Sequence, residues 1–187
     1  MENKKQASIF AMGEIKENLI INNKIIDYPV LNERAIRAGS GIMFVLATFA
    51  FVNAFFTDNF LYLKIVVVFF FIDFAIKVFI NPKFSPTSVV ARFIVRNQTP
   101  EFVGAIQKRF AWSLGLFMSA VMIVLLFVLN MTGTINLTMC AICLMLMFFE
   151  TSFGICLGCD IYYGLKKLNI IKSEQEPRCP GGSCDIT

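Results

Sequence analysis

Apolar residues along this chain form four long stretches, and the polar segments between them hold nearly all of the charges. The stretches cover residues 37–56, 60–80, 111–131 and 134–159. As an α-helix that rises about 1.5 Å per residue, each is long enough to cross about 30 Å of hydrocarbon. The pattern therefore predicts an all-α integral membrane protein with four transmembrane helices.

The links between these stretches determine how the helices connect. Thr57-Asp58-Asn59 joins the first two, and Thr132-Gly133 joins the last two. Links this short require neighbouring helices to run antiparallel. The Asn81-Pro82 step ends the second helix, because proline lacks an amide donor and disfavours helix before it. We therefore expect two antiparallel helical hairpins joined by a central loop.

The polar segments carry weaker local patterns. Apolar residues on both sides of Asn22-Asn23 predict a small N-terminal β-hairpin over residues 19–26. Asn32 is expected to cap the first helix. Thr99-Pro100-Glu101 is typical of a helix start, and this helix is expected to run through Lys108 into the third stretch.

The central loop also predicts a short amphipathic helix after Pro86. Its apolar side would consist of Val89, Val90, Phe93 and Ile94. Arg92 and Arg96 lie four residues apart on another side, where they suit the anionic inner leaflet of a membrane. We expect an interfacial helix in a cytoplasmic loop, and Arg92, Arg96 and Arg109 of that loop are candidate binding residues.

The distribution of Lys and Arg predicts the orientation. The N-terminal segment has six, the central loop five, the tail four and the two short links none. Because basic residues resist translocation, the three rich segments are expected in the cytoplasm, with both termini. The predicted parts are a cytoplasmic segment 1–31, a membrane domain 32–165 and a cytoplasmic tail 166–187. The basic residues that give the net charge of +4 are accounted for by their place in cytoplasmic segments of a membrane protein. Nucleic acid is therefore not an expected partner.

Among the charged residues of the predicted spans, Asp73, Lys77 and Glu150 are the ones that a membrane helix would lose unless something required them. A charge at mid-bilayer costs about 2.5–3.5 kcal/mol on insertion scales, so each needs a reason. Asp73 and Lys77 are four apart and can pair on one helix face. The three side chains could form one polar cluster between the second and fourth helices. The alternative is that Lys77 reaches the interface and Asp73 merely neutralises it. For Glu150 we favour a pathway or proton site.

All six cysteines lie in the last 48 residues, as three pairs. The pairs are Cys140/Cys143, Cys156/Cys159 and, in a Cys-Pro-Gly-Gly-Ser-Cys tail motif, Cys179/Cys184. The chain has no histidine, which excludes His-ligated zinc and histidine acid–base catalysis. Thiol chemistry and soft-metal binding by thiolates remain.

Helix geometry argues against a single relay of thiols along the fourth helix. On an unbroken helix, Cys156 and Cys159 fall nearly opposite Cys140, Cys143 and Glu150, so a relay would require a break near Gly154. At the C-terminus of such a helix the dipole also disfavours a thiolate at Cys156 and Cys159. The alternative for every cysteine in the spans is that it is a small packing residue.

The tail pair has no such packing explanation. In a reducing cytosol Cys179 and Cys184 are expected to be a dithiol or to hold a soft metal ion, and they are the candidate metal ligands. No resident cofactor is otherwise expected.

Several motifs together carry a resemblance to a known family. They are Asn32-Glu33-Arg34, Asn81-Pro82-Lys83-Phe84-Ser85-Pro86, Ala91-Arg92-Phe93, Pro100-Glu101-Phe102, Gln107-Lys108-Arg109-Phe110-Ala111-Trp112, Phe148-Phe149-Glu150 and Gly154-Ile155-Cys156-Leu157-Gly158-Cys159. Over about residues 28–163 the chain resembles a bacterial integral membrane family catalogued as domain-of-unknown-function family 4395. The resemblance implies a four-helix protein of the bacterial inner membrane and no established activity.

Three functional hypotheses follow. The first is the handling of thiols or sulfur, by transfer of reducing equivalents, sulfur or a sulfur compound. Cys156 and Cys159 would be the membrane dithiol and Glu150 a proton site, while the tail pair exchanges with a cytosolic thiol or sulfur-carrier protein. The second is binding or transport of Cu, Zn or Hg. The third is a structural or scaffolding role.

The chain shows no residue constellation for hydrolysis or phosphate transfer, so ordinary enzyme activity is not expected. Four helices are few for a self-contained translocation path, which favours a homo-oligomer in the lipid bilayer.

Overall fold

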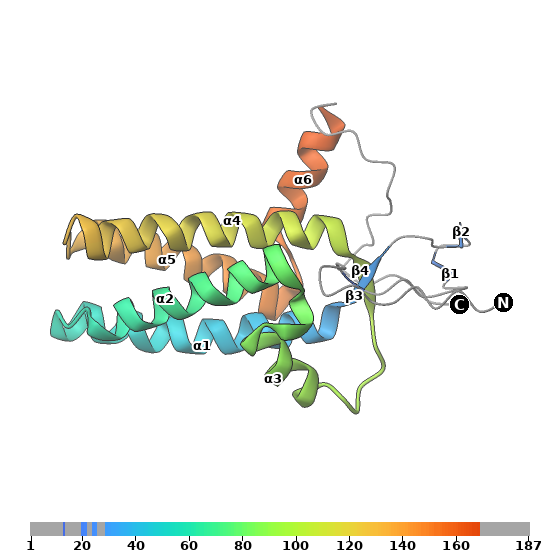
Figure 1. The fold of residues 1–187 in the computed structure, drawn as a ribbon, viewed down its shortest axis with the longest axis horizontal. Helices are drawn as coiled ribbons and strands as arrows, with labels where there is room; N and C mark the ends of the chain where they lie inside the picture. The colour runs from blue at the N-terminus through green and yellow to red at the C-terminus, as the bar shows by residue number, and fades with distance from the viewer. Residues whose placement is uncertain (1–12, 14–19, 22–23, 26–28, 169–187) are drawn as a thin grey trace.

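Four long helices lie side by side in this computed structural model, which describes residue 13 and residues 20–21, 24–25 and 29–168 (Figure 1). They are α1 (Glu33–Thr57), α2 (Leu61–Ala75), α4 (Ala105–Ile123) and α5 (Thr134–Phe148). Three of them continue as π-helical turns, which are Ile76–Ile80, Val124–Val128 and Phe149–Phe153. The short links lie at one end of the bundle, and the strands, α3 and α6 gather at the other.

Three helical segments are long and apolar enough to cross a membrane: Glu33–Thr57, Ala105–Val128 and Thr134–Phe153. The remaining long helix, α2 with its π turn, carries the charges Lys64, Asp73 and Lys77. The structure thus confirms helices suited to a membrane for three of the four predicted spans.

Small residues on α1 allow the bundle to pack closely. Ala47, Ala50 and Ala54, spaced three and four apart, are buried on one face of α1. A core cluster adds side chains from the other three helices: Leu63, Val67, Met122, Leu126 and Cys140. Close contact through small residues is typical of helix pairs in membranes, where no water drives association.

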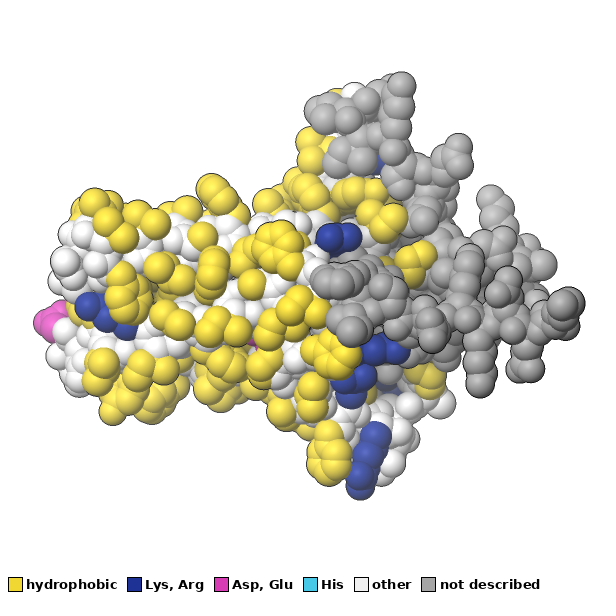
Figure 2. All heavy atoms as spheres, viewed as in Figure 1, with side chains coloured by type: hydrophobic (Ala, Val, Ile, Leu, Met, Phe, Trp, Pro, Cys, Tyr) yellow, Lys and Arg dark blue, Asp and Glu magenta, His cyan; other side chains and the backbone are white. Residues whose placement is uncertain are grey.

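The outside of the bundle is predominantly apolar (Figure 2). Examples of exposed side chains are Val45, Phe49, Phe56, Ile65, Phe79, Phe117 and Val128. Soluble proteins rarely expose contiguous apolar surface on this scale, so the surface fits a lipid environment. On the face in view, basic side chains gather mainly near α3 and the strands, with a smaller group at the opposite end.

Short strands precede α1 and α4. β3 (Val30–Asn32) pairs antiparallel with β4 (Phe102–Gly104), with Leu31 opposite Val103. β1 (Ile20–Ile21) pairs with β2 (Lys24–Ile25), which confirms the N-terminal hairpin, although its Asn22-Asn23 turn lies outside the described residues.

The predicted start of the third long helix is wrong. α4 begins at Ala105 rather than at Thr99-Pro100-Glu101, because the intervening residues pair with β3 instead of entering the helix. Glu101 binds Arg34 at 2.6 Å, and its carbonyl accepts from the amide of Glu33. The other local prediction is confirmed, since Asn32 accepts from the amide of Arg34 and caps α1.

The helix predicted after Pro86 is present as α3 (Pro86–Ile94). It packs on α1, where the Ala91 side chain faces Gly39. Its apolar residues Val89, Val90, Phe93 and Ile94 are exposed. Arg92 donates to the carbonyl of Lys83 and Arg96 lies over the ring of Phe93.

Candidate functional site

The helix that carries the cysteines is broken at Gly154. The π turn after α5 ends at Phe153, and Gly154 has φ +68°, a left-handed conformation that side-chain-bearing residues rarely adopt. A new helix, α6 (Leu157–Lys167), then leaves the bundle at a steep angle (Figure 1). The prediction of one helix over residues 134–159 is therefore wrong, because Gly154 permits a helix C-cap at this point.

Because of the break, the second cysteine pair lies at the start of a helix and not at the end of one. Cys156 is the N-cap of α6 and Cys159 lies in its first turn. The expectation that both sit at a helix C-terminus is wrong. The positive end of the α6 dipole favours a thiolate here, whereas the negative end of an unbroken helix would disfavour one.

The two thiols of this pair have different environments. Both are free, with Cys159 buried and Cys156 half-buried. The hydrogen bond to Cys156, together with burial, raises the pKa of the Cys159 thiol. Cys159 therefore retains its proton, and Cys156 is the more accessible sulfur.

A close contact holds the start of α6 against α4. A Cβ atom at Gly158 would lie 2.8 Å from the Cα and 2.7 Å from the Cβ of Ala111, closer than real Cβ atoms approach. At Gly164, further along α6, a Cβ atom would meet nothing within 4 Å. Gly158 thus permits the approach that brings the dithiol to α4.

We expect Gly158→Ala to displace α6 from α4 and to destabilise the fold by about 1–3 kcal/mol, the range typical of overpacking. Thermal unfolding of the purified protein in detergent measures this, and faster alkylation of Cys159 would report its exposure. Gly164→Ala is the matched control on the same helix and should be neutral or slightly stabilising. Equal melting temperatures for the two variants would contradict the role of Gly158.

A buried ion-paired cluster lies beside the dithiol. Lys108 of α4 is 3% exposed. Its Nζ lies 3.0 Å from a carboxylate oxygen of Glu33 and 3.2 Å from one of Glu150. Ser40 donates to the other oxygen of Glu150 at 2.8 Å. The positive charge of Lys108 also interacts electrostatically with Cys156 and Cys159.

Lys108 and Glu33 were not among the candidates from sequence because both lie outside the apolar stretches. In the sequence, Lys108 is one of the basic residues that predict the orientation in the membrane, and Glu33 is part of one family motif. The available signal was that both occur within the motifs that carry the family resemblance. Glu150 has no cation close to it in the sequence, and the structure provides Lys108, 42 residues away, as its partner.

Asp73 and Lys77 form the predicted pair, at 2.7 Å. The Asp73 carboxylate also accepts from Ser85 and Thr87 at the start of α3. Lys77 is 5% exposed and donates to Thr87, so its ammonium is held inside the protein by Asp73 and Thr87. The single cluster with Glu150 is not formed, because Glu150 bonds to Lys108 and Ser40.

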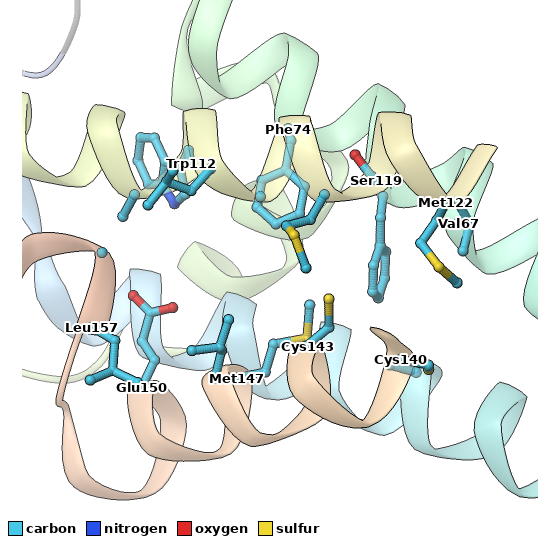
Figure 3. A pocket seen from close by; sticks show the side chains of 18 of the residues that line it. Val67, Phe74, Trp112, Ser119, Met122, Cys140, Cys143, Met147, Glu150 and Leu157 are labelled. Atoms are coloured by element: carbon cyan, nitrogen blue, oxygen red, sulfur yellow. The ribbon is translucent and has the colours of Figure 1, made fainter. Parts of the chain in front are cut away.

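A cavity of about 190 Å³ lies among α2, α4 and α5 and extends to the start of α6 (Figure 3). Its wall includes Cys140, Cys143, Glu150 and Cys156. Cys156 reaches the same cavity as the other three because the chain breaks at Gly154, which is the condition that the helix geometry required. Figure 3 shows the Glu150 carboxylate pointing toward Trp112 across the cavity.

The remaining predicted site residues lie elsewhere. Arg92, Arg96 and Arg109 are exposed and do not line this cavity. Cys179 and Cys184 lie outside the described residues. Within the part of the chain that the structure describes, no group of three or more Cys, Asp or Glu side chains could hold a metal ion.

Together these features define a helical protein with segments suited to a membrane, a thiol pair at a helix N-terminus and a buried Lys–Glu cluster beside it. The chain belongs to the family described as "Domain of unknown function (DUF4395)", which it matches over residues 31–167. This confirms the resemblance seen in the motifs, and the matched region contains the six α-helices of the described residues. No curated protein and no solved structure matches the chain.

Proposed function

We propose that this protein performs thiol–disulfide exchange at a membrane, with Cys156 as the attacking thiolate and Cys159 as the resolving thiol. One observation carries the proposal: the Cys156-x-x-Cys159 pair lies at the N-terminus of α6, where the positive charge of Lys108 acts on both sulfurs. A helix N-terminus and a neighbouring cation both stabilise a thiolate, which is the reactive form of cysteine.

The different environments of the two thiols suit successive steps. The Cys156 thiolate attacks a disulfide of a partner, which forms a mixed disulfide and releases one partner thiolate. Cys159 then gives up its proton and attacks the Cys156 sulfur. The Cys156–Cys159 disulfide forms and the second partner thiolate leaves. Two electrons pass to the partner, and the two thiol protons end on its thiolates.

Two groups near the pair could move those protons. Glu150 and Lys108 form an ion pair at 3.2 Å, and Glu150 borders the same cavity as Cys156. The tail pair, Cys179 and Cys184, would exchange electrons with a cytosolic thiol or sulfur-carrier protein. In this arrangement the tail delivers or removes electrons and the α6 dithiol acts at the membrane.

The proposal places the chain in the bacterial inner membrane with four crossings, by α1, α2, α4 and α5. Pairing supports a crossing by α2, because Asp73 and Lys77 neutralise one another. The remaining α2 cation, Lys64, lies over the ring of Phe127. The exposed apolar side of α3 supports an interfacial position on the cytoplasmic side. A reporter fused after Thr187 should be cytoplasmic, and a periplasmic signal would refute this orientation.

Alkylation of the purified full-length protein tests the exchange. In glutathione redox buffers we expect a Cys156–Cys159 disulfide, located by peptide mapping. Cys159→Ser should retain glutathione on Cys156. In Cys156→Ser, the remaining thiol Cys159 should be modified about tenfold or more slowly than Cys156 is in the unaltered protein, because the buried thiol keeps its proton. Cys143→Ser is the matched control and should behave as the unaltered protein.

Two results would reject this function. One is modification of Cys156 no faster than that of Cys143, without formation of the disulfide. The other is protection of the thiols by Zn²⁺ or Cu⁺, reversed by a chelator, in a protein that never forms the disulfide. That second result would favour soft-metal binding instead.

A further inference from the structure

The cavity beside the dithiol has two chemically different ends. Near α6 its wall holds Glu150, Cys156 and the ring of Trp112. At the other end, where Figure 3 shows Val67 and Met122, the wall is predominantly apolar. Because α4 and α5 are apolar enough to cross a membrane, a ligand would enter from the lipid. The cavity therefore suits an amphiphile with a headgroup near the dithiol and an aliphatic chain.

Aromatic rings border the end where the headgroup would lie. Trp112 and Phe74 both line the cavity, as Figure 3 shows. The buried ammonium of Lys77 lies 5.8 Å from the centre of the Trp112 ring and 5.5 Å from that of Phe74, which helps to hold both rings in place. Flat aromatic ligands stack favourably on such rings.

We propose that this cavity binds a lipid-soluble quinone, which oxidises the Cys156–Cys159 dithiol. The inference rests on the proposed function run in the reverse direction: a partner dithiol reduces the Cys156–Cys159 disulfide by exchange, and the quinone then reoxidises the pair. A quinone combines the three required properties: a flat ring, polar oxygens beside Glu150 and an apolar chain. A phospholipid acyl chain would match only the apolar end and would place methylene groups against Glu150 and Cys156.

Oxidation of the Cys156–Cys159 dithiol by a quinone conserves atoms and electrons. The Cys156 sulfur adds to a ring carbon, a C–S bond forms, and one ring oxygen receives a proton. Cys159 then attacks the Cys156 sulfur, so that the S–S bond forms while the C–S bond breaks and its electron pair stays on the ring. The second ring oxygen takes the other proton. The two thiols thus lose two electrons and two protons, and the quinone becomes a quinol.

Glu150 can pass those protons, because its carboxylate borders the cavity and is bonded to Lys108 and Ser40. In this role Glu150 and Lys108 are positioning and proton-transfer groups, while the sulfur of Cys156 makes the bond to the ring. The cavity also exposes Cys140 and Cys143 to the same ligand, but neither is required for the balance.

The protein contains an internal reporter, because Trp112 is its only tryptophan and lines the cavity. Quinones quench tryptophan fluorescence. Titration of the reduced full-length protein in detergent with decylubiquinone should give saturable quenching of Trp112. Absorbance should show one quinol per chain, accompanied by one Cys156–Cys159 disulfide.

A matched pair of variants locates the binding. Ser119 lines the cavity and Ser113, on the same helix, does not. Ser119→Leu should raise the dissociation constant obtained from the quenching titration about tenfold, which corresponds to about 1.4 kcal/mol. Ser113→Leu should bind decylubiquinone like the unaltered protein. Cys159→Ser should still be quenched but should produce no quinol.

The outcomes separate the two proposals. The quinone proposal fails if quenching does not saturate, or if Ser119→Leu and Ser113→Leu bind equally. It also fails if brominated phospholipid quenches Trp112 and decylubiquinone does not displace it, since an acyl chain then fills the cavity. Oxidation by glutathione disulfide without quinol formation would overturn the quinone proposal alone. Failure of both oxidants to form the Cys156–Cys159 disulfide would overturn the proposed function as well.

Discussion

Replacement of Lys108 by Met should destabilise the protein by about 3–5 kcal/mol, the cost of leaving buried charge without its partner. Lys108 lies between two carboxylates that share its ammonium, Glu33 at 3.0 Å and Glu150 at 3.2 Å. Without the cation, these two side chains would repel one another away from bulk water. Thermal unfolding in detergent, followed by Trp112 fluorescence, measures the effect.

Two further variants show whether the cause is electrostatic. Arg109→Met changes the neighbouring, exposed residue and should alter stability by no more than about 0.5 kcal/mol, as is usual for surface substitutions. Glu33→Gln in the Lys108→Met background should restore part of the lost stability, because it removes one of the unpaired charges. Similar melting temperatures for Lys108→Met and Arg109→Met would show that the cluster contributes little.

Loss of Lys108 should also slow the reaction of Cys156. The ammonium interacts with both thiols of the α6 pair, so its removal leaves only the helix dipole to stabilise the thiolate. The initial rate of maleimide labelling at Cys156 in protein that remains folded is the relevant measurement. An unchanged rate would separate Lys108 from the thiol chemistry and restrict it to a structural role.

Replacement of Asp73 by Asn is expected to have the second large effect, also about 3–5 kcal/mol. Asp73 is fully buried and is paired with Lys77 at 2.7 Å. An amide at this position would leave the buried ammonium without a counter-charge. It would also weaken the bonds from Ser85 and Thr87 that hold the start of α3.

Hydrogen exchange resolves this effect by region. Asp73→Asn should increase exchange in α3 beyond the general loss of stability, because α3 loses the carboxylate to which its N-terminus is bonded. Asp58→Asn is the matched control, since Asp58 lies exposed in the link after α1 and Asn tolerates its positive φ. Adding Lys77→Met to Asp73→Asn should recover stability. Unaltered exchange in α3 would show that Asp73 does not anchor it.

Features that depend on neighbouring residues were predictable from the sequence. The long helices follow from apolar stretches, and their ends from short links and the Asn81-Pro82 step. The Asp73–Lys77 pair follows from a spacing of four on one helix, and the cap at Asn32 from a single side chain. Each of these involves atoms a few residues apart, so the local pattern contains the required information.

The start of α4 shows the limit of that information. The segment Thr99-Pro100-Glu101 has suitable residues for a helix start, yet residues 102–104 form a strand with residues 30–32. Pairing with a strand about 70 residues away provides those backbone groups with hydrogen-bond partners. The local preference was real, and the distant partner decided the outcome.

The sequence by itself determined the class of protein, the long helices, and the thiols and charges available to them. The tertiary structure decided which of these groups meet. Lys108 reaches Glu33 across 75 residues of sequence and Glu150 across 42, and only the left-handed Gly154 places Cys156 at a helix N-terminus beside them. Pairing of buried charges and the direction of a chain after a break depend on the packing of several helices. A pattern along one helix does not contain that packing.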